Sequence, residues 1–323
     1  MTTEQINAEF VVPPELAERR LDQAAADLMP EHSRARIQGW IKSGQLTVNG
    51  QSRKPRDKVQ IEDRIVVAAV VEGQSRWEAE PIRLQVVYED EDLIVIDKPA
   101  GLVVHPAAGH AAGTLVNALL HYAPELDRLP RAGVVHRLDK DTTGLMVVAR
   151  SLEAHTSLVS QLQERTMGRE YEAVVTGELT GGGTVNQPIG RHPQQRQKMA
   201  VVAGGKPAVT HYRLIKRFRG HTHILCQLET GRTHQIRVHM AHIRHPLVGD
   251  PVYGGRMRLP PGTTETLQRA LSEFPRQALH ARRLKLDHPA TGEPMSWESP
   301  LPDDMVQLLA TLAAFDDAWD GGA

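Results

Sequence analysis

The chain reads VVHRLDKDTTGLMVVA at residues 134–149, with a polar segment between two apolar ones. The apolar ends, residues 134–135 and 144–149, favour strands, because short aliphatic and β-branched runs are typical of buried strands. Charged side chains such as those at residues 136–143 are costly inside a core unless each has a partner. We therefore expect the chain to leave the sheet at residues 136–143 and to form a loop or cleft there.

The surrounding sequence predicts a sheet with few helices. Further strands are expected at residues 84–88, 93–96 and 170–175, and helices at residues 114–122 and from residue 235, with Thr233 as the N-cap. Because only two amphipathic helices separate these strands, the pattern predicts an α+β fold with a large mixed, mainly antiparallel β-sheet. Cys226, the single cysteine, lies in a strand-like run and is expected in the core.

The first quarter of the chain predicts a small module of two helices and a β-hairpin. Apolar spacing indicates helices at residues 20–28 and 34–43, the second capped by Ser33. Strands are expected at residues 46–48 and 64–71, and Asn49-Gly50 is a strong hairpin signal. We divide the chain into an N-terminal arm (1–17), this module (18–75), a linker (76–83), a second domain (84–310) and an acidic C-terminal tail (311–323).

The net charge of −1 conceals two basic stretches. Residues 34–58 carry a charge of +6 and residues 191–244 carry +10, whereas acidic residues gather at 89–92 and 303–320. One such stretch is more often a solvated face, but two favour a polyanionic partner such as RNA. The residues of the first stretch that we expect to contact RNA are Arg34, Arg36, Lys42, Arg53 and Lys54.

Composition and the first residues argue against several classes of protein. A content of 40% hydrophobic and 24% charged residues is ordinary for a globular protein. The longest apolar run, residues 65–71, is too short to cross a bilayer, and the start MTTEQINAEF lacks the pattern of a signal peptide. We expect a cytoplasmic protein that does not contact membranes.

Several segments resemble known families. SRARIQGWIKSGQLTVNG, at residues 33–50, resembles the S4 RNA-binding domain, which implies that the first module places its second helix on RNA. HRLDKDTTGLMVVAR, at residues 136–150, resembles the signature loop of the RNA pseudouridine synthases of the ribosomal large-subunit type. Three further segments fit that family in its order, namely DKPAGLVVHP (97–106), REYEAVV (169–175) and LETGRTHQIRVHMAHIRHPLVGDPVYGG (228–255).

This resemblance implies an isomerase that converts uridine to pseudouridine, with its catalytic cleft across the sheet. The implied substrate is 23S ribosomal RNA, alone or in a pre-50S particle, at specific uridines in the loop of helix 69. The reaction needs neither energy input nor redox change, so we expect no cofactor and no metal. We expect the protein to act as a monomer.

The resemblance also implies the site residues. Asp139 is the essential carboxylate, Arg237 is the guanidinium that holds it ionised, and Tyr171 stacks on the uracil. Further substrate contacts are expected from Arg137, which would fill the gap left by a flipped nucleotide, from Ile236 on the other face of the base, and from Arg232 and Lys140. Lys98 and His105 are expected to shape the cleft without a chemical role.

Some alternatives stay open. Asp139 could attack C6 of the base, attack C1′ of the ribose, or assist removal of a proton from C2′, because each route places one carboxylate against the same nucleotide. The protein could instead be a non-catalytic RNA-binding or ribosome assembly factor. A metal hydrolase is a third hypothesis, suggested by the histidines at residues 234, 239, 242 and 245, but the segment lacks HExxH and contains three arginines.

Overall fold

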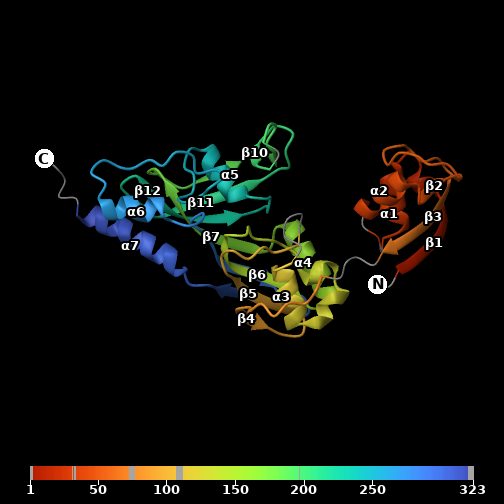
Figure 1. Ribbon diagram of the computed structural model, residues 1–323, viewed down its shortest axis with the longest axis horizontal. Helices are drawn as coiled ribbons and strands as arrows, with labels where there is room; N and C mark the ends of the chain where they lie inside the picture. Colours follow the sequence, from red (N-terminus) through yellow and green to blue (C-terminus); the bar gives the residue numbers. More distant parts are fainter. Residues whose placement is uncertain are drawn as a thin grey trace. The chain divides into compact units, whose positions relative to one another are not determined.

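The protein consists of two compact units, Met1–Arg76 and Trp77–Ala323. A computed structural model describes residues 3–30, 32, 34–72, 77–106, 112–195 and 197–318. Each unit has its own sheet and its own hydrophobic core (Figure 1). None of the described helices combines the length and the apolarity that a bilayer-spanning segment needs.

The first unit packs two helices on a three-stranded antiparallel sheet. The helices are α1 (Leu21–Leu28) and α2 (Arg34–Ser43), preceded by a short 3-10 helix η1 (Pro14–Leu16). The strands β1 (Thr3–Val11), β2 (Leu46–Val48) and β3 (Arg64–Glu72) lie in the order β1-β3-β2. These bounds confirm the two predicted helices and the strands of the predicted hairpin. The expected cap Ser33 lies outside the described residues.

Two details of this unit differ in how well they could be predicted. Asn49 and Gly50 have φ values of 52° and 74°, and Val48 and Gln51 exchange two hydrogen bonds across them, as expected of an Asn-Gly hairpin turn. The expected N-terminal arm, however, is not an arm, because Thr3–Val11 pairs along its whole length with β3. Its partner lies some 60 residues away in sequence, which local patterns do not reveal.

The second unit is built on a nine-stranded sheet (Figure 1). Its strand order is β4-β5-β6-β13-β7-β12-β11-β8, with β14 paired to β13. The strands are β4 (Val86–Glu89), β5 (Leu93–Lys98), β6 (Thr143–Ala149), β7 (Gly168–Thr176), β8 (Gly183–Asn186), β11 (Val209–Phe218), β12 (His221–Leu228), β13 (Leu279–Asp287) and β14 (Pro294–Glu298). Every pair is antiparallel except β13 with β6. The predicted α+β fold with a mixed, mainly antiparallel sheet is confirmed.

The parallel junction between β6 and β13 is short and tight. It has two residue pairs, His280 with Thr143 and Ala281 with Gly144. Gly144 has a φ of 111°, and a Cβ atom there would lie 2.3 Å from the carbonyl oxygen of Ala281. Only glycine fits this close approach. The segment 136–142 enters the sheet at this junction, directly before β6.

Helices cover both faces of the sheet around β6, which is buried along its whole length. Met146 and Val148 belong to the core with α3 (Leu115–Tyr122), whereas Leu145 and Val147 belong to the core with α4 (Leu152–Glu164). The other elements of this unit are η2 (Pro124–Arg128), η3 (Pro130–Gly133), the pair β9 (Ile189–Arg191) and β10 (Met199–Val201), α5 (Gln235–His242), α6 (Glu265–Ser272) and α7 (Asp303–Asp317). Cys226 is fully buried, as predicted.

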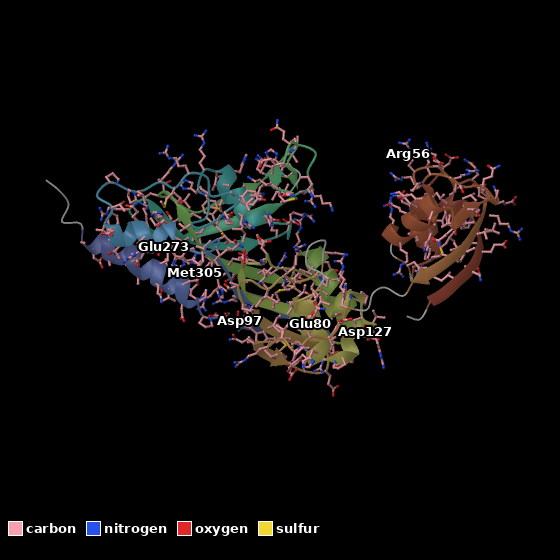
Figure 2. All side chains as sticks on the ribbon, viewed as in Figure 1. Arg56, Glu80, Asp97, Asp127, Glu273 and Met305 are labelled. Atoms are coloured by element: carbon pink, nitrogen blue, oxygen red, sulfur yellow. The ribbon has the colours of Figure 1, made fainter. Side chains whose placement is uncertain are left out.

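The unit has more helix than the two helices expected. The segment 311–323 was expected to be an acidic tail, but as far as residue 317 it continues α7. This helix buries Met305, Leu308, Leu312 and Phe315 (Figure 2 labels Met305). The segment therefore has an apolar face, which the acidic residues between these positions made hard to recognise. In the other direction, the strand expected at residues 134–135 is reduced to one isolated bridge, between Val134 and Val148.

The stretch expected to be a free linker is attached to the second unit. Trp77 packs against its core and lies 6.1 Å from the ring of His105. The backbone oxygen of Glu78 accepts a hydrogen bond from Asn117, and the carboxylate of Glu80, labelled in Figure 2, accepts one from the N–H of Gly113. Residues 77–80 therefore belong to the fold of the second unit.

Candidate active site

A buried lysine fixes the loop that carries Asp139. Lys98, at the end of β5, is 1% exposed, and its three ammonium protons fit three carbonyl acceptors. Its Nζ donates to the oxygens of Pro99 (2.7 Å), Leu102 (3.0 Å) and Lys140 (2.8 Å). Burial lowers the pKa of Lys98 to about 8, although the negative charges of Asp141 and Asp139 act to raise it. Lys98 therefore holds the backbone next to Asp139, which is more than the shaping role expected of it.

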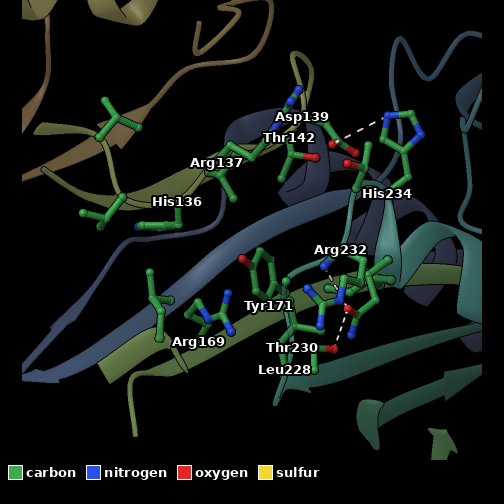
Figure 3. Close-up of a pocket in the computed structure, with 18 of the residues that line it drawn as sticks. His136, Arg137, Asp139, Thr142, Arg169, Tyr171, Leu228, Thr230, Arg232 and His234 are labelled. Carbon is green, nitrogen blue, oxygen red and sulfur yellow. Dashed lines mark hydrogen bonds and ion pairs between the residues drawn. The ribbon is translucent and has the colours of Figure 1, made fainter. Parts of the chain in front are cut away.

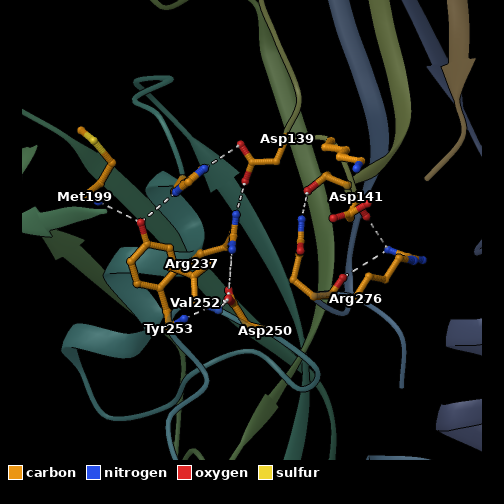
Figure 4. Close-up of polar contacts among 12 residues, drawn as sticks. Asp139, Asp141, Met199, Arg237, Asp250, Val252, Tyr253 and Arg276 are labelled. Carbon is orange, nitrogen blue, oxygen red and sulfur yellow. Dashed lines mark hydrogen bonds and ion pairs between the residues drawn. The ribbon is translucent and has the colours of Figure 1, made fainter. Parts of the chain in front are cut away.

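A buried arginine holds the same loop from the other side. Arg276 Nη1 donates to the carbonyl oxygen of Asp141 at 3.2 Å, and the Gln277 amide donates to Thr142 Oγ1 at 3.0 Å. Figure 4 draws the bond between Arg276 and Asp141. Arg276 is itself fixed by Asp304 of α7, through bonds of 2.7 and 2.8 Å. Since consecutive carbonyls are held by two cations, the backbone at residues 140–141 is rigidly placed.

Asp139 lies at one end of a chain of paired charges. Arg237 Nη1 donates to Asp139 Oδ2 at 2.9 Å, while its Nε and Nη2 donate to the two oxygens of Asp250 at 2.7 and 2.9 Å (Figure 4). The Asp250 carboxylate is fully buried and also accepts the N–H groups of Val252 and Tyr253. One arginine thus joins two carboxylates in a fixed plane.

The pKa values in this chain follow from burial and pairing. Burial on its own lowers the pKa of Arg237, but its hydrogen bonds and charge pairing with Asp250 and Asp139 raise it above the usual value. Burial on its own raises the pKa of Asp250, but the hydrogen bonds from Arg237 hold it below its usual value. Both groups therefore stay charged at neutral pH, and Arg237 offers Asp139 a permanent cation.

His234 lies next to the other carboxylate oxygen of Asp139 and is itself bonded to Tyr253. His234 Nε2 lies 3.8 Å from Asp139 Oδ1, and its Nδ1 is 2.8 Å from the hydroxyl of Tyr253. That hydroxyl accepts the N–H of Met199 on β10 at 3.0 Å. Burial lowers the pKa of His234, although the negative charge of Asp139 acts to raise it. His234, in the left-handed region (φ 56°), is also the residue before α5, so the predicted cap by Thr233 was wrong.

Asp139, His234 and Arg237 line a cavity of about 840 Å³ (Figure 3). Tyr171 on β7 and Ile236 on α5 are both buried and both line it, together with Leu138, His105 and Leu279. Burial raises the pKa of the Tyr171 phenol. A cavity of this volume, with an apolar ring, an aliphatic side chain and an ion-paired carboxylate, suits a flat polar ring such as a nucleobase.

Arginines surround the cavity. Arg137 and Arg165 are exposed, and Arg232 is partly buried, with its Nε bonded to the Pro207 carbonyl at 3.0 Å. Of the residues predicted for the site, the structure therefore brings Asp139, Arg237, Tyr171, Arg137, Ile236 and Arg232 to one cavity. Lys140 is the exception, because its side chain is exposed and does not line the cavity, and its contribution is the carbonyl that Lys98 holds.

In the first unit, Arg34, a predicted RNA contact, has an internal partner. Arg34 donates through Nε and Nη2 to the buried carboxylate of Asp22, at 3.0 and 2.8 Å, and so do Arg20 and Gln38. Arg34 thus holds α2 against α1 and keeps 45% of its side chain exposed. Lys42 and Lys54 are exposed, and Arg53 is partly buried.

The histidines do not form a metal site in the described part of the chain. His239 contacts Thr210 and Gln187, and His245 contacts the carbonyl of Thr176. The one group there with ligand-like spacing is Asp90, Asp92 and His288, and its residues bond one another, Tyr88 and backbone N–H groups.

Four residues around Asp139 were not predicted to act on it. Asp250 and Tyr253 lie in GDPVYGG, the end of a motif already singled out, yet their contacts to Arg237 and His234 depend on the turn after residue 249. Arg276 lies outside every motif. His234 was considered only as a metal ligand. The only signal in the sequence for such contacts was a polar residue that lies near a charged residue of a motif.

Two kinds of comparison agree on what this chain resembles. The family model for RNA pseudouridylate synthase matches residues 92–242, and the S4 domain model matches residues 19–65. A relative from Pseudomonas aeruginosa, named ribosomal large subunit pseudouridine synthase D, is 63% identical over 310 residues, which is 96% of this chain and 97% of the relative. A relative of the same name from Escherichia coli (strain K12) is 56% identical over 297 residues, covering 92% of this chain and 91% of the relative.

A solved structure shares the fold of much of the chain. Human RNA pseudouridylate synthase domain containing 4 is 28% identical, with a TM-score of 0.56 over 71% of this chain and 93% of that one.

Proposed function

The chain belongs to the RNA pseudouridylate synthase family, and on that premise we propose that it converts specific uridines of large-subunit ribosomal RNA to pseudouridine. It is an isomerase with an S4 domain at its N-terminal end. The observation that carries the proposal is the Asp139–Arg237 pair, with an N–O distance of 2.9 Å, in the wall of a cavity that Tyr171 and Ile236 also line.

Asp139 is the group that we expect to act on the nucleotide. The loop anchors at Lys98 and Arg276 fix its backbone, and Arg237 fixes one carboxylate oxygen. The other oxygen, 3.8 Å from His234 Nε2, is the one left to approach the substrate. Holding a charged reactant in one geometry before the substrate arrives removes much of the entropic cost of the reaction.

The cavity is expected to hold the uracil while it is detached. Isomerisation breaks the bond from C1′ to N1, turns the base and joins C1′ to C5, so the free base must stay in place. Tyr171 offers a flat ring to one face and Ile236 an aliphatic group to the other. The exposed Arg137 is expected to occupy the space that the flipped nucleotide leaves, and Arg232 and Lys140 to contact the RNA backbone.

The proposal leaves the order of steps open and needs no cofactor. Attack at C6, attack at C1′ and proton removal at C2′ all use the one carboxylate of Asp139. Each route ends with the same atoms rearranged, because the proton lost from C5 is balanced by the one that N1 gains. We therefore propose a reaction without cofactor or metal.

We further propose that the substrate is 23S ribosomal RNA, alone or in a pre-50S particle, at uridines of the helix 69 loop. The relatives from Pseudomonas aeruginosa and Escherichia coli carry the ribosomal large subunit in their names, and they cover almost the whole chain. We propose that the S4 domain binds RNA through Arg34, Arg36, Lys42, Arg53 and Lys54, and that the protein acts as a monomer.

Tritium release from C5 of uridine tests the proposal. A 23S transcript and a helix 69 stem-loop, both labelled with tritium at C5, are incubated with wild type, with Asp139→Asn and with the control Asp141→Asn. Wild type is expected to release tritium, and Asp139→Asn to lose at least about 1000-fold in rate while it still binds RNA. Asp141→Asn changes the same charge in the same loop and is expected to keep most of the activity.

The other outcomes separate the remaining hypotheses. Tight RNA binding by wild type without tritium release from any large-subunit RNA would favour a non-catalytic assembly factor. Release from the 23S transcript but not from the helix 69 stem-loop would leave the reaction in place and remove the proposed site of modification.

A further inference from the structure

One buried arginine in the cavity has no acceptor for its charge among the residues that the structure describes. Arg169, on β7, is 6% exposed and lines the cavity. Its Nε is buried and has no hydrogen-bond partner, and within the described residues no carboxylate or carbonyl pairs with its guanidinium. Figure 3 shows its side chain beside that of Tyr171, with Asp139 on the other side of the tyrosine in this view. A permanent positive charge therefore faces the place where the substrate is expected.

The other buried cations of the chain show how unusual this is. Arg237 and Arg276, which are 4% and 3% exposed, each have a carboxylate bound in the two-pronged manner, from Asp250 and Asp304. Lys98 has three carbonyl acceptors. Burying a charge without a partner costs stability. Among these four buried cations, only Arg169 lacks a partner within the described residues. The simplest reason for its burial is an acceptor that comes from outside the chain.

The surrounding backbone makes room for the guanidinium. A Cβ atom on Gly231 would lie 2.6 Å from Arg169 Nη1, so the glycine leaves space that any side chain would take. Arg169 and Tyr171 are two residues apart on one strand and therefore point to the same face of the sheet. A base stacked on Tyr171 would thus have Arg169 at its edge.

Burial also separates Arg169 from the cations suited to phosphate. Arg137 and Arg165 line the same cavity but are exposed. A phosphate must stay with the backbone, whereas the flipped base enters the cavity. The buried guanidinium is therefore placed for the base.

We propose that Arg169 donates to a carbonyl oxygen of the uracil and stabilises the negative charge that the base acquires during the reaction; this rests on the proposed function. Attack at C1′ or loss of the C2′ proton leaves the electron pair of the C1′–N1 bond on the base, spread over N1, O2 and O4. Attack at C6 moves the ring π electrons toward C5 and O4. The charge disappears when C5 bonds to C1′, C5 loses its proton and N1 gains one. The cation thus favours all three routes.

Arg169→Met and Arg169→Lys test this on the full chain. The methionine has similar length and no charge, and the lysine keeps the charge. With the labelled helix 69 RNA or 23S transcript, we expect Arg169→Met to lose about 100-fold or more in single-turnover rate at saturating RNA, as when one charge-stabilising donor is removed. RNA affinity and its salt dependence should stay within about threefold of wild type, and Arg169→Lys should recover much of the rate.

The thermal midpoint of unfolding distinguishes this proposal from a structural role of Arg169. Removing an unpaired buried charge is expected to leave the thermal midpoint of Arg169→Met equal to or above that of wild type. The matched control is Arg276→Gln, which breaks a paired buried arginine and should lower the midpoint. A lowered midpoint for both Arg169 variants, of the size seen in Arg276→Gln, would mean that Arg169 is structural and would overturn the proposal.

Two further results would also overturn it. Weaker RNA binding with a salt slope reduced by about one, at an unchanged saturated rate, would make Arg169 a phosphate contact. A rate unchanged in Arg169→Met would deny it any part in the reaction. The wild-type reaction is separate, because a wild type without turnover on any RNA removes the proposed function and this inference with it, whatever the variants do.

Discussion

Replacing Asp250 by asparagine would remove one charge from the centre of the site without changing the shape of the side chain. One oxygen of its carboxylate accepts Arg237 Nη2 and the N–H groups of Val252 and Tyr253, and the other accepts Arg237 Nε. An asparagine can supply the first oxygen, but its NH₂ group would then face Arg237 Nε, and two donors repel.

The expected magnitude follows from these contacts. Breaking a buried ion pair by removing one partner costs about 3–5 kcal/mol. Arg237 and Asp250 are such a pair, with bonds of 2.7 and 2.9 Å. We expect the free energy of unfolding of Asp250→Asn to fall by that amount, against a total of about 5–15 kcal/mol for a typical domain. Arg237 would keep only Asp139 as a counterion, and a displacement of about 1 Å at the reacting carboxylate costs on the order of 100-fold in rate.

Urea unfolding and single-turnover tritium release measure the two effects. The matched control is Glu172→Gln, because Glu172 is also paired and only 13% of its side chain is exposed. It bonds His223 at 2.8 Å and Arg282 at 3.1 Å but does not contact Arg237 or Asp139. The control should lose stability and keep its turnover rate. If Asp250→Asn were as stable and as active as wild type, Arg237 would not depend on Asp250, and the reasoning about the charge chain would be refuted.

The pH dependence gives a second check on the same pair. Burial on its own raises the pKa of Asp250, but the pKa lies below its usual value because Arg237 donates to the charged form. A folded-state pKa below the unfolded one means that the carboxylate stabilises the fold above about pH 4 and stops doing so as the pH falls through the folded value. The stability difference between wild type and Asp250→Asn should therefore shrink at acid pH.

Three further predictions concern the supports of the site and the first unit. Burial lowers the pKa of Lys98 to about 8, so above that pH its ammonium loses a proton that binds a carbonyl. As the pH rises above about 8, turnover should fall, while folding stability should rise because the unfolded lysine still binds a proton. Lys98→Met should remove this alkaline fall from the pH–rate profile. Tyr253→Phe leaves the N–H of Met199 without its acceptor and should cost about 1 kcal/mol in thermal unfolding. Asp22→Asn should destabilise the first unit by about 3 kcal/mol and speed hydrogen exchange in α1 and α2, with exchange in the second unit unchanged.

The sequence predicted the parts of the site that local pattern and motif order carry. The charged break between two apolar segments marked the loop at Asp139, and four motifs in family order predicted that Tyr171 and Arg237 would meet it. The structure places these three residues around one cavity. The strands at 84–88 and 93–96 and the helix at 114–122 also follow from apolar spacing alone, and the structure agrees within two residues.

The parts that could not be predicted depend on contacts between distant residues. Nothing local shows that the side chain of Arg276 reaches the carbonyl of Asp141, or that Lys98 holds Lys140. The same is true of β1, whose partner is at the far end of its unit. In α7 the signal was present, since Met305, Leu308, Leu312 and Phe315 recur at helical spacing, but acidic residues between them gave the impression of a tail.

The position of β13 between β6 and β7 has a consequence for synthesis of the chain. A ribosome releases the chain from its N-terminal end, and domains fold as their residues emerge. The strand at Leu279–Asp287 is needed to join β6 to β7, so until it emerges each of these has an open edge. The loop with Asp139 precedes β6, and Tyr171 lies on β7. The newly made enzyme thus gains its cavity only after Leu279–Asp287 has been translated, and a messenger cut short before codon 279 would yield two half-sheets prone to pair with other chains.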